Sequence, residues 1–156
     1  MTITIIIFAL ILIDQITKYL IRINFQEGET LPIISDIFHL TYVRNRGAAF
    51  SIFENIEIVT ILIPIIIIVL TMAFLIHYKN KISKAMLISM SLIIAGGLSN
   101  LIDRVIFGYV TDMIDFRFFP VFNIADIAVT IGCILIIISL FIPFNGENDK
   151  AEGSKE

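Results

Sequence analysis

Four long apolar segments constrain the fold of this chain more than any other feature of the sequence. They cover residues 2–23, 57–77, 84–102 and 124–144. Each comes close to the length of about 20 mostly apolar residues that an α-helix needs to cross a bilayer. The composition agrees, since 58% of the residues are hydrophobic and only 16% are charged, whereas a soluble domain needs far more polar surface. The sequence therefore predicts an all-α membrane protein with four transmembrane helices.

The two longer connections between these segments are expected to form a small β-sheet and a short helix. Residues 31–45 and 105–122 are rich in β-branched and aromatic residues, with a turn expected at Gly108, and both read as extended chain. Residues 47–58 (GAAFSIFENIEI) are amphipathic and predict a short helix in the membrane interface. Residues 1–144 would then form a single membrane domain, followed by a polar, disordered tail over 145–156.

The distribution of basic residues predicts that both chain ends face the cytoplasm. The short connection after the second segment contains Lys79, Lys81 and Lys84 and no acidic residue, and the tail adds two more lysines. The long first connection has Arg44 and Arg46 but also five acidic residues. Because lysine and arginine collect on the cytoplasmic side, the protein is expected to be multi-pass, N-in and C-in, with the small sheet extracytoplasmic.

Helical rise places most of the polar residues at one depth. Asp14 lies about 18 Å and Asn100 about 24 Å above the inner face of a hydrocarbon core about 30 Å thick. Asp103 and Arg104 fall at the outer boundary, and Asp126 begins the last segment. The inner half is almost wholly apolar. This pattern favours a protein with a site near the outer leaflet. The alternative function is a small four-helix membrane transporter, which would need polar groups across the inner half as well.

The densest polar stretch, residues 100–126, contains four aspartates and joins the third and fourth segments. Asn123 and Asp126 have the spacing of a helix capping box, and a helix N-terminus stabilises a carboxylate. A second carboxyl group close to Asp126 would share a proton with it, and such a pair can activate water. Asp112 and Asp115 are the candidates. Three residues apart in an extended segment, they face opposite sides, and the residue pattern alone does not choose between them.

Other polar positions have a structural interpretation beside a functional one. Asp14 and Lys18 lie on one helix face and form either a structural ion pair or part of a substrate site. Asn45 lies in a polar turn or in a ligand-holding loop. Arg104 either pairs with Asp103 or binds a substrate carbonyl group. The glycines of AGGLSN (95–100) are expected to permit close helix packing. A serine–lysine protease using Lys18 with Ser51 or Ser99 is a weaker reading, because the neighbouring acid favours a charged lysine.

Five motifs together resemble those of the bacterial lipoprotein signal peptidases, the signal peptidase II family. They are DQITK (14–18), RNRGAAFS (44–51), GGLSNLIDR (96–104), GYVTDMID (108–115) and FNIAD (122–126), in the order and spacing of the family. The resemblance implies an aspartic endopeptidase of the bacterial cytoplasmic (inner) membrane. Such an enzyme removes the signal peptide of prolipoproteins, cutting just before a cysteine that carries diacylglycerol. Met113 is a small departure, since phenylalanine is expected there.

The resemblance also assigns roles to individual residues. The catalytic pair of the family falls on Asp112 and Asp126, which favours Asp112 over Asp115. Positions that line the site or support it fall on Asp14, Asn45, Asn100, Asp103, Arg104 and Asn123. No metal or cofactor is implied, and a net charge of −3 argues against a nucleic-acid partner. The expected partners are prolipoprotein signal peptides carrying diacylglyceryl-cysteine and membrane lipids, and the protein is expected to be a monomer.

Overall fold

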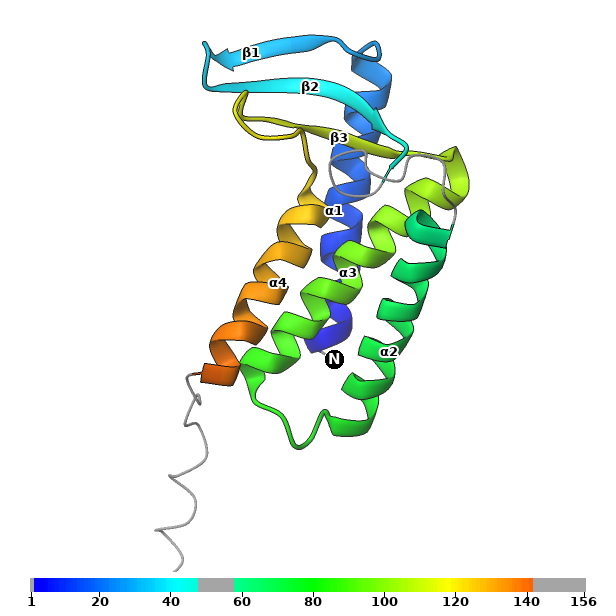
Figure 1. The fold of residues 1–156 in the computed structure, drawn as a ribbon, viewed down its shortest axis with the longest axis vertical. Helices are drawn as coiled ribbons and strands as arrows, with labels where there is room; N and C mark the ends of the chain where they lie inside the picture. The colour runs from blue at the N-terminus through cyan, green and yellow to red at the C-terminus, as the bar shows by residue number, and fades with distance from the viewer. Residues whose placement is uncertain (1, 48–57, 142–156) are drawn as a thin grey trace, which may run out of the picture.

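A bundle of helices with a small sheet across one end makes up the part of the chain that the computed structural model describes, residues 2–47 and 58–141 (Figure 1). The helices are α1 (Thr2–Asn24), α2 (Ile63–Tyr78), α3 (Lys84–Phe107) and α4 (Ile124–Phe141), and a π-helical turn, η2 (Ile58–Leu62), leads into α2. The helix expected over residues 47–58 and the tail expected over 145–156 lie outside the described residues, apart from Gly47 and Ile58.

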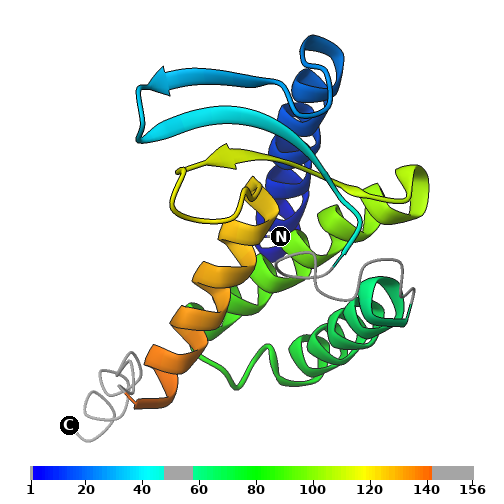
Figure 2. The same cartoon turned by 45° about the horizontal axis from the view of Figure 1, so that its top comes forward.

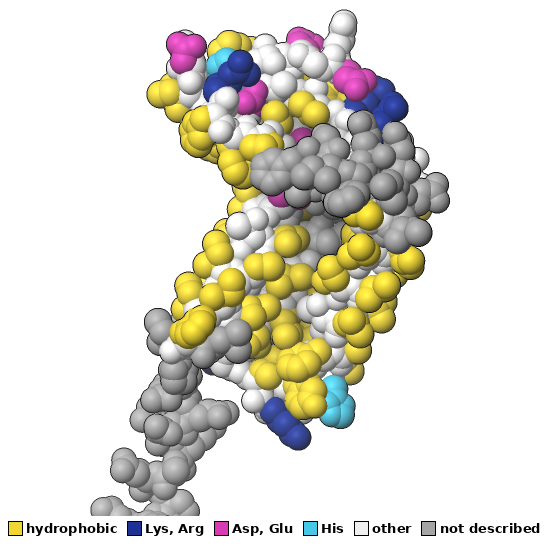
Figure 3. All heavy atoms as spheres, in the orientation of Figure 1, with side chains coloured by type: hydrophobic (Ala, Val, Ile, Leu, Met, Phe, Trp, Pro, Cys, Tyr) yellow, Lys and Arg dark blue, Asp and Glu magenta, His cyan; other side chains and the backbone are white. Residues whose placement is uncertain are grey.

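Three helical stretches are long and apolar enough to cross a membrane, namely Ile3–Asn24, Val59–Tyr78 and Lys84–Phe107. The fourth, α4, is equally apolar in character but is described over only 18 residues. Exposed isoleucine, leucine and phenylalanine side chains cover the visible face of the helices. Acidic and basic side chains gather at the sheet, and basic and histidine side chains lie at the opposite end (Figure 3). An apolar outer surface is what lipid contact requires, so this is a membrane protein.

Helix α3 forms the centre of the bundle and packs against the other three helices. Glycines make its closest approach to α4 possible: a Cβ atom on Gly96 would lie 2.4 Å from the carbonyl oxygen of Ala125, and one on Gly132 would lie 2.7 Å from that of Ser89. A Cβ atom on Gly97 would lie 3.0 Å from Ile68 of α2. The small residues thus permit close helix packing, as the sequence predicts.

Replacing Gly132 with valine is expected to force α3 and α4 apart, because the added atoms would meet the backbone of α3. We expect a loss of about 1–3 kcal/mol in the free energy of unfolding, the usual cost of overpacking. Thermal unfolding in detergent measures it. The matched control is Ile134→Val, a shortening on the exposed face of the same helix. An equal unfolding temperature for the two variants would contradict the packing argument.

Helix α3 runs five residues beyond the predicted end at residue 102, because side chains of another helix stabilise its charged end: Asp103 accepts a hydrogen bond from Gln15 of α1 at 3.1 Å and pairs with Lys18 at 3.5 Å. Asp103 also accepts a hydrogen bond from the backbone of Thr111 at 3.0 Å. The helix stops at Gly108, which adopts a left-handed conformation with φ of 76° and donates its N–H to the carbonyl oxygen of Arg104. The turn expected at Gly108 is therefore present, and it directs the chain into the sheet.

The sheet has three antiparallel strands in the order β1 (Thr30–Ile34), β2 (Phe38–Asn45) and β3 (Val110–Asp115). Both connections expected to be extended contribute strands. Val43 of β2 lies opposite Asp112 of β3, and Asn45 lies opposite Val110. The sheet lies across the end of the bundle where α3 ends and α4 begins (Figures 1 and 2). This arrangement holds residues of β2 and β3 directly above the helices.

Candidate active site

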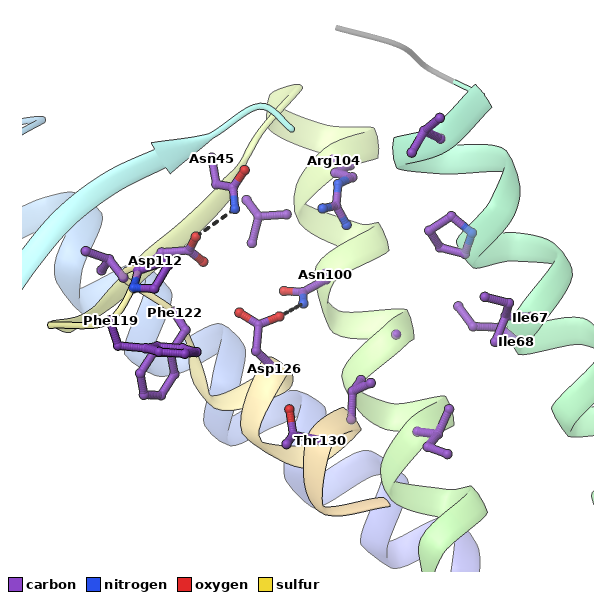
Figure 4. Close-up of a pocket in the computed structure, with 18 residues that line it drawn as sticks. Asn45, Ile67, Ile68, Asn100, Arg104, Asp112, Phe119, Phe122, Asp126 and Thr130 are labelled. Atoms are coloured by element: carbon purple, nitrogen blue, oxygen red, sulfur yellow. Dashed lines mark hydrogen bonds between the residues drawn. The ribbon is translucent and has the colours of Figure 1, made fainter. Parts of the chain in front are cut away.

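A cavity of about 460 Å³ lies where β3, α3 and α4 meet, and part of α2 closes it on one side (Figure 4). Most of its wall is apolar. The amide, guanidinium and carboxyl groups in the wall come from Asn45, Asn100, Arg104, Asp112 and Asp126. A mostly apolar cavity with a few convergent polar groups is the usual form of a small-molecule or peptide site.

The carboxyl groups of Asp112 and Asp126 point into this cavity from two different elements (Figure 4). Asp112 lies in the middle of β3 and is 1% exposed. Strand alternation sends Asp115 elsewhere, where it accepts hydrogen bonds from the hydroxyl of Thr41 at 2.7 Å and from the backbone of Arg117 at 2.8 Å. The structure therefore brings Asp112, and not Asp115, together with Asp126.

Three asparagine side chains donate hydrogen bonds to the two carboxyl groups. Asn45 and Asn123 donate to opposite oxygens of Asp112, at 3.0 Å and 2.6 Å, and Asn100 donates to Asp126 at 2.7 Å. Burial raises the pKa of Asp112 to about 7, the negative charge of Asp126 adds to the rise, and the two amides oppose it. Asp112 therefore exchanges a proton near neutral pH, whereas an exposed aspartate is fully ionised there.

Asn123 and Asp126 form the capping box that the sequence predicts. The side-chain oxygen of Asn123 accepts a hydrogen bond from the backbone of Asp126 at 2.9 Å, and the carboxylate of Asp126 accepts one from the backbone of Asn123 at 3.2 Å. These bonds fix Asp126 in the first turn of α4, where the helix N-terminus stabilises negative charge. Capping and a place in the site are thus compatible for this residue.

Arg104 lies in the wall of the cavity opposite the two aspartates. One of its terminal nitrogens donates to the backbone oxygen of Gly47 at 3.2 Å. Its Nε atom is buried and has no hydrogen-bond partner among the described residues. A buried N–H group without a partner is costly, so this atom is available to an acceptor that enters the cavity.

Asp14 and Asp103 lie behind the cavity rather than in its wall, and both side chains are fully buried. Asp14 accepts hydrogen bonds from Ser99 at 2.7 Å and from the backbone of Ala125 at 2.9 Å, and it pairs with Lys18 at 2.7 Å. These contacts join α1, α3 and α4, which supports the structural interpretation of Asp14. They also leave neither Ser99 nor Lys18 free to act as a nucleophile and its base.

Sequence reasoning missed the apolar wall that η2 and α2 contribute, formed by Val59 of η2 and by Pro64, Ile67 and Ile68 of α2. Nothing in an isoleucine-rich helix distinguishes a residue that faces a cavity from one that faces lipid. The π-helical turn at the start of α2 is the one local irregularity there, and such turns often occur at functional sites. Among the described residues, no group of three or more metal-ligating side chains is placed to hold an ion.

Comparisons with known proteins show the family of the chain. Residues 6–142 match the family model of signal peptidase (SPase) II. Proteins named lipoprotein signal peptidase from Halothermothrix orenii and Moorella thermoacetica are 45% and 43% identical, over 88% and 84% of this chain and 93% and 87% of their own lengths. A solved structure described as a bacterial membrane enzyme superposes with a TM-score of 0.84 at 35% identity, covering 99% of this chain and 93% of the other. This chain therefore belongs to the signal peptidase II family.

Proposed function

We propose that this protein is an aspartic endopeptidase whose catalytic groups are Asp112 and Asp126. As a member of the family, it is a protease that removes the signal peptide of prolipoproteins. The observation that carries the catalytic assignment is the convergence of a buried carboxyl group from β3 and a partly buried one from α4 in one largely apolar cavity. Two carboxyl groups that share one proton can activate water and polarise a carbonyl group together.

In the proposed reaction, the ionised carboxylate takes a proton from water as the oxygen attacks the scissile carbonyl carbon. The protonated partner gives its proton to the carbonyl oxygen. When the tetrahedral intermediate collapses, the carbon–nitrogen bond breaks, the amine takes a proton from the first carboxyl group, and the second recovers its own. The pair titrates as one unit. A pKa of about 7 for Asp112 supports this scheme, because it keeps one proton in the site near neutral pH.

The cavity also suggests how a substrate is held. Its apolar side, between α2, α3 and α4, suits the apolar part of a signal peptide. Arg104, whose Nε has no partner in the described part of the chain, and Asn45 are placed to bind peptide carbonyl groups beside the aspartates. The diacylglycerol chains of the substrate cysteine would stay in the outer leaflet. The remaining candidates support the site: Asn100 and Asn123 bind the two carboxyl groups, and Asp14 and Asp103 fix the helices behind them.

The proposed topology has four spans, with both chain ends in the cytoplasm of a bacterium and the site near the outer leaflet of its inner membrane. The 18 residues of α4 extend about 27 Å, close to the thickness of the hydrocarbon core. The lysine-containing connection between α2 and α3 lies at the end opposite the sheet (Figure 1), which is the cytoplasmic end by the distribution of charge. We also propose that the protein acts as a monomer.

Purified protein in detergent tests the proposal when it is given a prolipoprotein precursor with and without the diacylglyceryl group. We expect cleavage of the lipidated precursor only, at the bond just before the modified cysteine, with the products identified by mass spectrometry. Equal cleavage of both precursors would contradict the requirement for the lipid. Cleavage of neither, by protein that unfolds cooperatively, would contradict the function.

The rate of cleavage is expected to fall as the pH rises above about 7. The pKa of Asp112 is raised from its ordinary 3.8 to about 7, so the pair retains its shared proton below that value and loses it above. With both carboxyl groups ionised, no acid remains to polarise the carbonyl group. The measurement is kcat/KM from about pH 5 to about pH 9 on a precursor without titratable groups near the cut. A constant rate up to the alkaline limit would contradict the shared proton.

A further inference from the structure

Lys18 is a fully buried cation that the proposed reaction does not use and that does not line the cavity. Its ammonium group has three N–H bonds and three acceptors. Two are carboxylates, Asp14 at 2.7 Å and Asp103 at 3.5 Å, and the third is the side-chain oxygen of Asn100 at 2.7 Å. The two carboxylates already compensate the buried charge. Charge compensation therefore does not explain the short bond from Lys18 to the neutral amide of Asn100.

The bond to Lys18 determines which way the amide of Asn100 faces. An ammonium group only donates hydrogen bonds, so the amide must present its oxygen to Lys18. Its nitrogen then faces the cavity and donates to the carboxylate of Asp126 at 2.7 Å (Figure 4). A flipped amide would put N–H groups against the ammonium group and an oxygen against the carboxylate, and it would lose both bonds.

The other two asparagines of the site have fixed orientations as well, but a backbone group fixes each of them. The oxygen of Asn123 accepts a bond from the backbone of Asp126 at 2.9 Å, and the oxygen of Asn45 accepts one from the backbone of Gly47 at 3.0 Å. All three amides thus present only N–H groups to the carboxyl pair. Asn100 alone depends on side chains for its orientation: its oxygen accepts a bond from Asn123 at 3.2 Å and a much shorter one from Lys18 at 2.7 Å.

We propose that Lys18 is a positioning residue for catalysis: it fixes the amide of Asn100 so that Asp126 is held ionised as the base, while Asp112 keeps the shared proton. The inference rests on the proposed aspartic mechanism and adds the assignment of the two roles. Asp126 then takes the proton from water, and Asp112 gives its proton to the carbonyl oxygen. The position of Asp126 in the first turn of α4 favours the same assignment.

Two acids balance the charge of Lys18, which leaves the amide as its short-range route to the carboxyl pair, beside a direct electrostatic attraction to both carboxyl groups. Asp14 faces Lys18 from the same helix, and Asp103 faces it from α3 with Arg22 3.5 Å from its carboxylate. The negative charges of Asp14 and Asp103 therefore balance the positive charges of Lys18 and Arg22. The carboxyl groups of Asp112 and Asp126 lie beyond Asn100 and Asn123, which bond to each other at 3.2 Å. Lys18 therefore acts on the pair mainly by orienting Asn100 and polarising its N–H group.

Lys18→Met tests the inference, since methionine is nearly as long but neutral and donates no hydrogen bond. We expect kcat to fall by about tenfold or more and KM to stay within about twofold, because Lys18 does not line the cavity. The acidic limb of the kcat–pH profile should move up by about one pH unit, because ionised Asp126 loses its fixed donor. A purely structural role for Lys18 would not move this limb.

Gln15→Leu is the matched control at the same interface of α1 and α3. Gln15 donates to the backbone of Ser99 and to Asp103, both at 3.1 Å, and has no hydrogen bond to Asn100 or to the carboxyl pair. This variant should have a lower unfolding temperature and an unmoved pH profile. If Lys18→Met and Gln15→Leu have the same kcat and the same profile, Lys18 is only structural and the inference is wrong.

Asn100→Leu provides a second test if Lys18→Met does not fold, because it removes the amide and keeps the pair of Lys18 with Asp14. It should move the acidic limb in the same direction by a similar amount. A wild-type profile in Asn100→Leu would overturn the inference. Full cleavage by a variant that lacks Asp112 or Asp126 would instead overturn the proposed function, so the two failures are distinguishable.

Discussion

Replacement of either Asp112 or Asp126 by asparagine is expected to lower kcat for cleavage by about 1,000-fold or more. Each substitution keeps the size of the side chain but removes either the base that takes a proton from water or the acid that polarises the carbonyl group. Because the two groups act as a unit, the double variant should be only slightly less active than either single variant. The measurement is single-turnover cleavage of a lipidated precursor in detergent.

Stability separates loss of chemistry from loss of fold in this experiment. Since the pKa of Asp112 is raised from 3.8 to about 7, folded protein binds more protons than unfolded protein between these values. The stabilising contribution is complete below 3.8 and is lost as the pH rises to about 7. An asparagine is neutral throughout, so Asp112→Asn should lack this loss and unfold at a temperature no lower than wild type above pH 7.

Asp115→Asn is the matched control, since Asp115 lies on the same strand but outside the cavity wall. It should retain cleavage within a few-fold of wild type, with some loss of stability from its bonds to Thr41 and Arg117. Folded Asp112→Asn or Asp126→Asn with near-normal cleavage would show that the catalytic assignment is wrong. Equal cleavage rates for Asp115→Asn and Asp112→Asn would show that a place in the cavity wall does not distinguish a catalytic aspartate from any other on this strand.

Removing the carboxylate of Asp14 is expected to cause the largest loss of stability. Asp14→Ala leaves Lys18 without its closer carboxylate and deprives the hydroxyl of Ser99 and the backbone of Ala125 of their acceptor. Breaking a buried pair on one side costs about 3–5 kcal/mol. The free energy of unfolding in mixed micelles measures the change, and Asp14→Asn, which keeps an acceptor oxygen, should lose less.

A surface ion pair provides the comparison for that experiment. Glu27 lies 3.3 Å from Arg44, and both side chains are at least one-third exposed. Glu27→Gln should therefore change the free energy of unfolding by less than about 1 kcal/mol. A comparable loss in Asp14→Ala and Glu27→Gln would mean that the buried contacts do not hold α1, α3 and α4 together.

The fold was largely predictable because lipid imposes a simple rule on the sequence. Long apolar runs mark the helices, and β-branched connections mark the strands. The sequence predicts an end of α3 that is five residues too early, because the charged residues Asp103 and Arg104 are typical of a loop after an apolar segment. Asp103 accepts a hydrogen bond from the backbone of Thr111, and Arg104 lines the cavity. Both placements depend on how the sheet and the helices pack, which the local sequence does not show.

The site was predictable only in part. Alternation along a strand showed that Asp112 and Asp115 face opposite ways, but which of them faces Asp126 depends on the register of β2 and β3. That register is a long-range property, and only the family resemblance anticipated it. The bond between Lys18 and Asn100 likewise joins residues 82 positions apart, and no local sequence pattern predicts it.

The way in which α2 is attached has a consequence for how a membrane-borne peptide reaches the cavity. Helix α2 lies beside α3 and apart from α1 and α4 (Figure 2), and among the described helices it packs mainly against α3, through apolar side chains. Buried polar bonds instead tie α1, α3, α4 and the sheet together. Lipid tails are as apolar as isoleucine, so moving α2 aside exchanges one apolar contact for another at little cost in free energy. The site thus combines a half in which hydrogen bonds align the reacting groups with an apolar wall that is held by dispersion contacts, and we expect substrate to enter on the side of that wall.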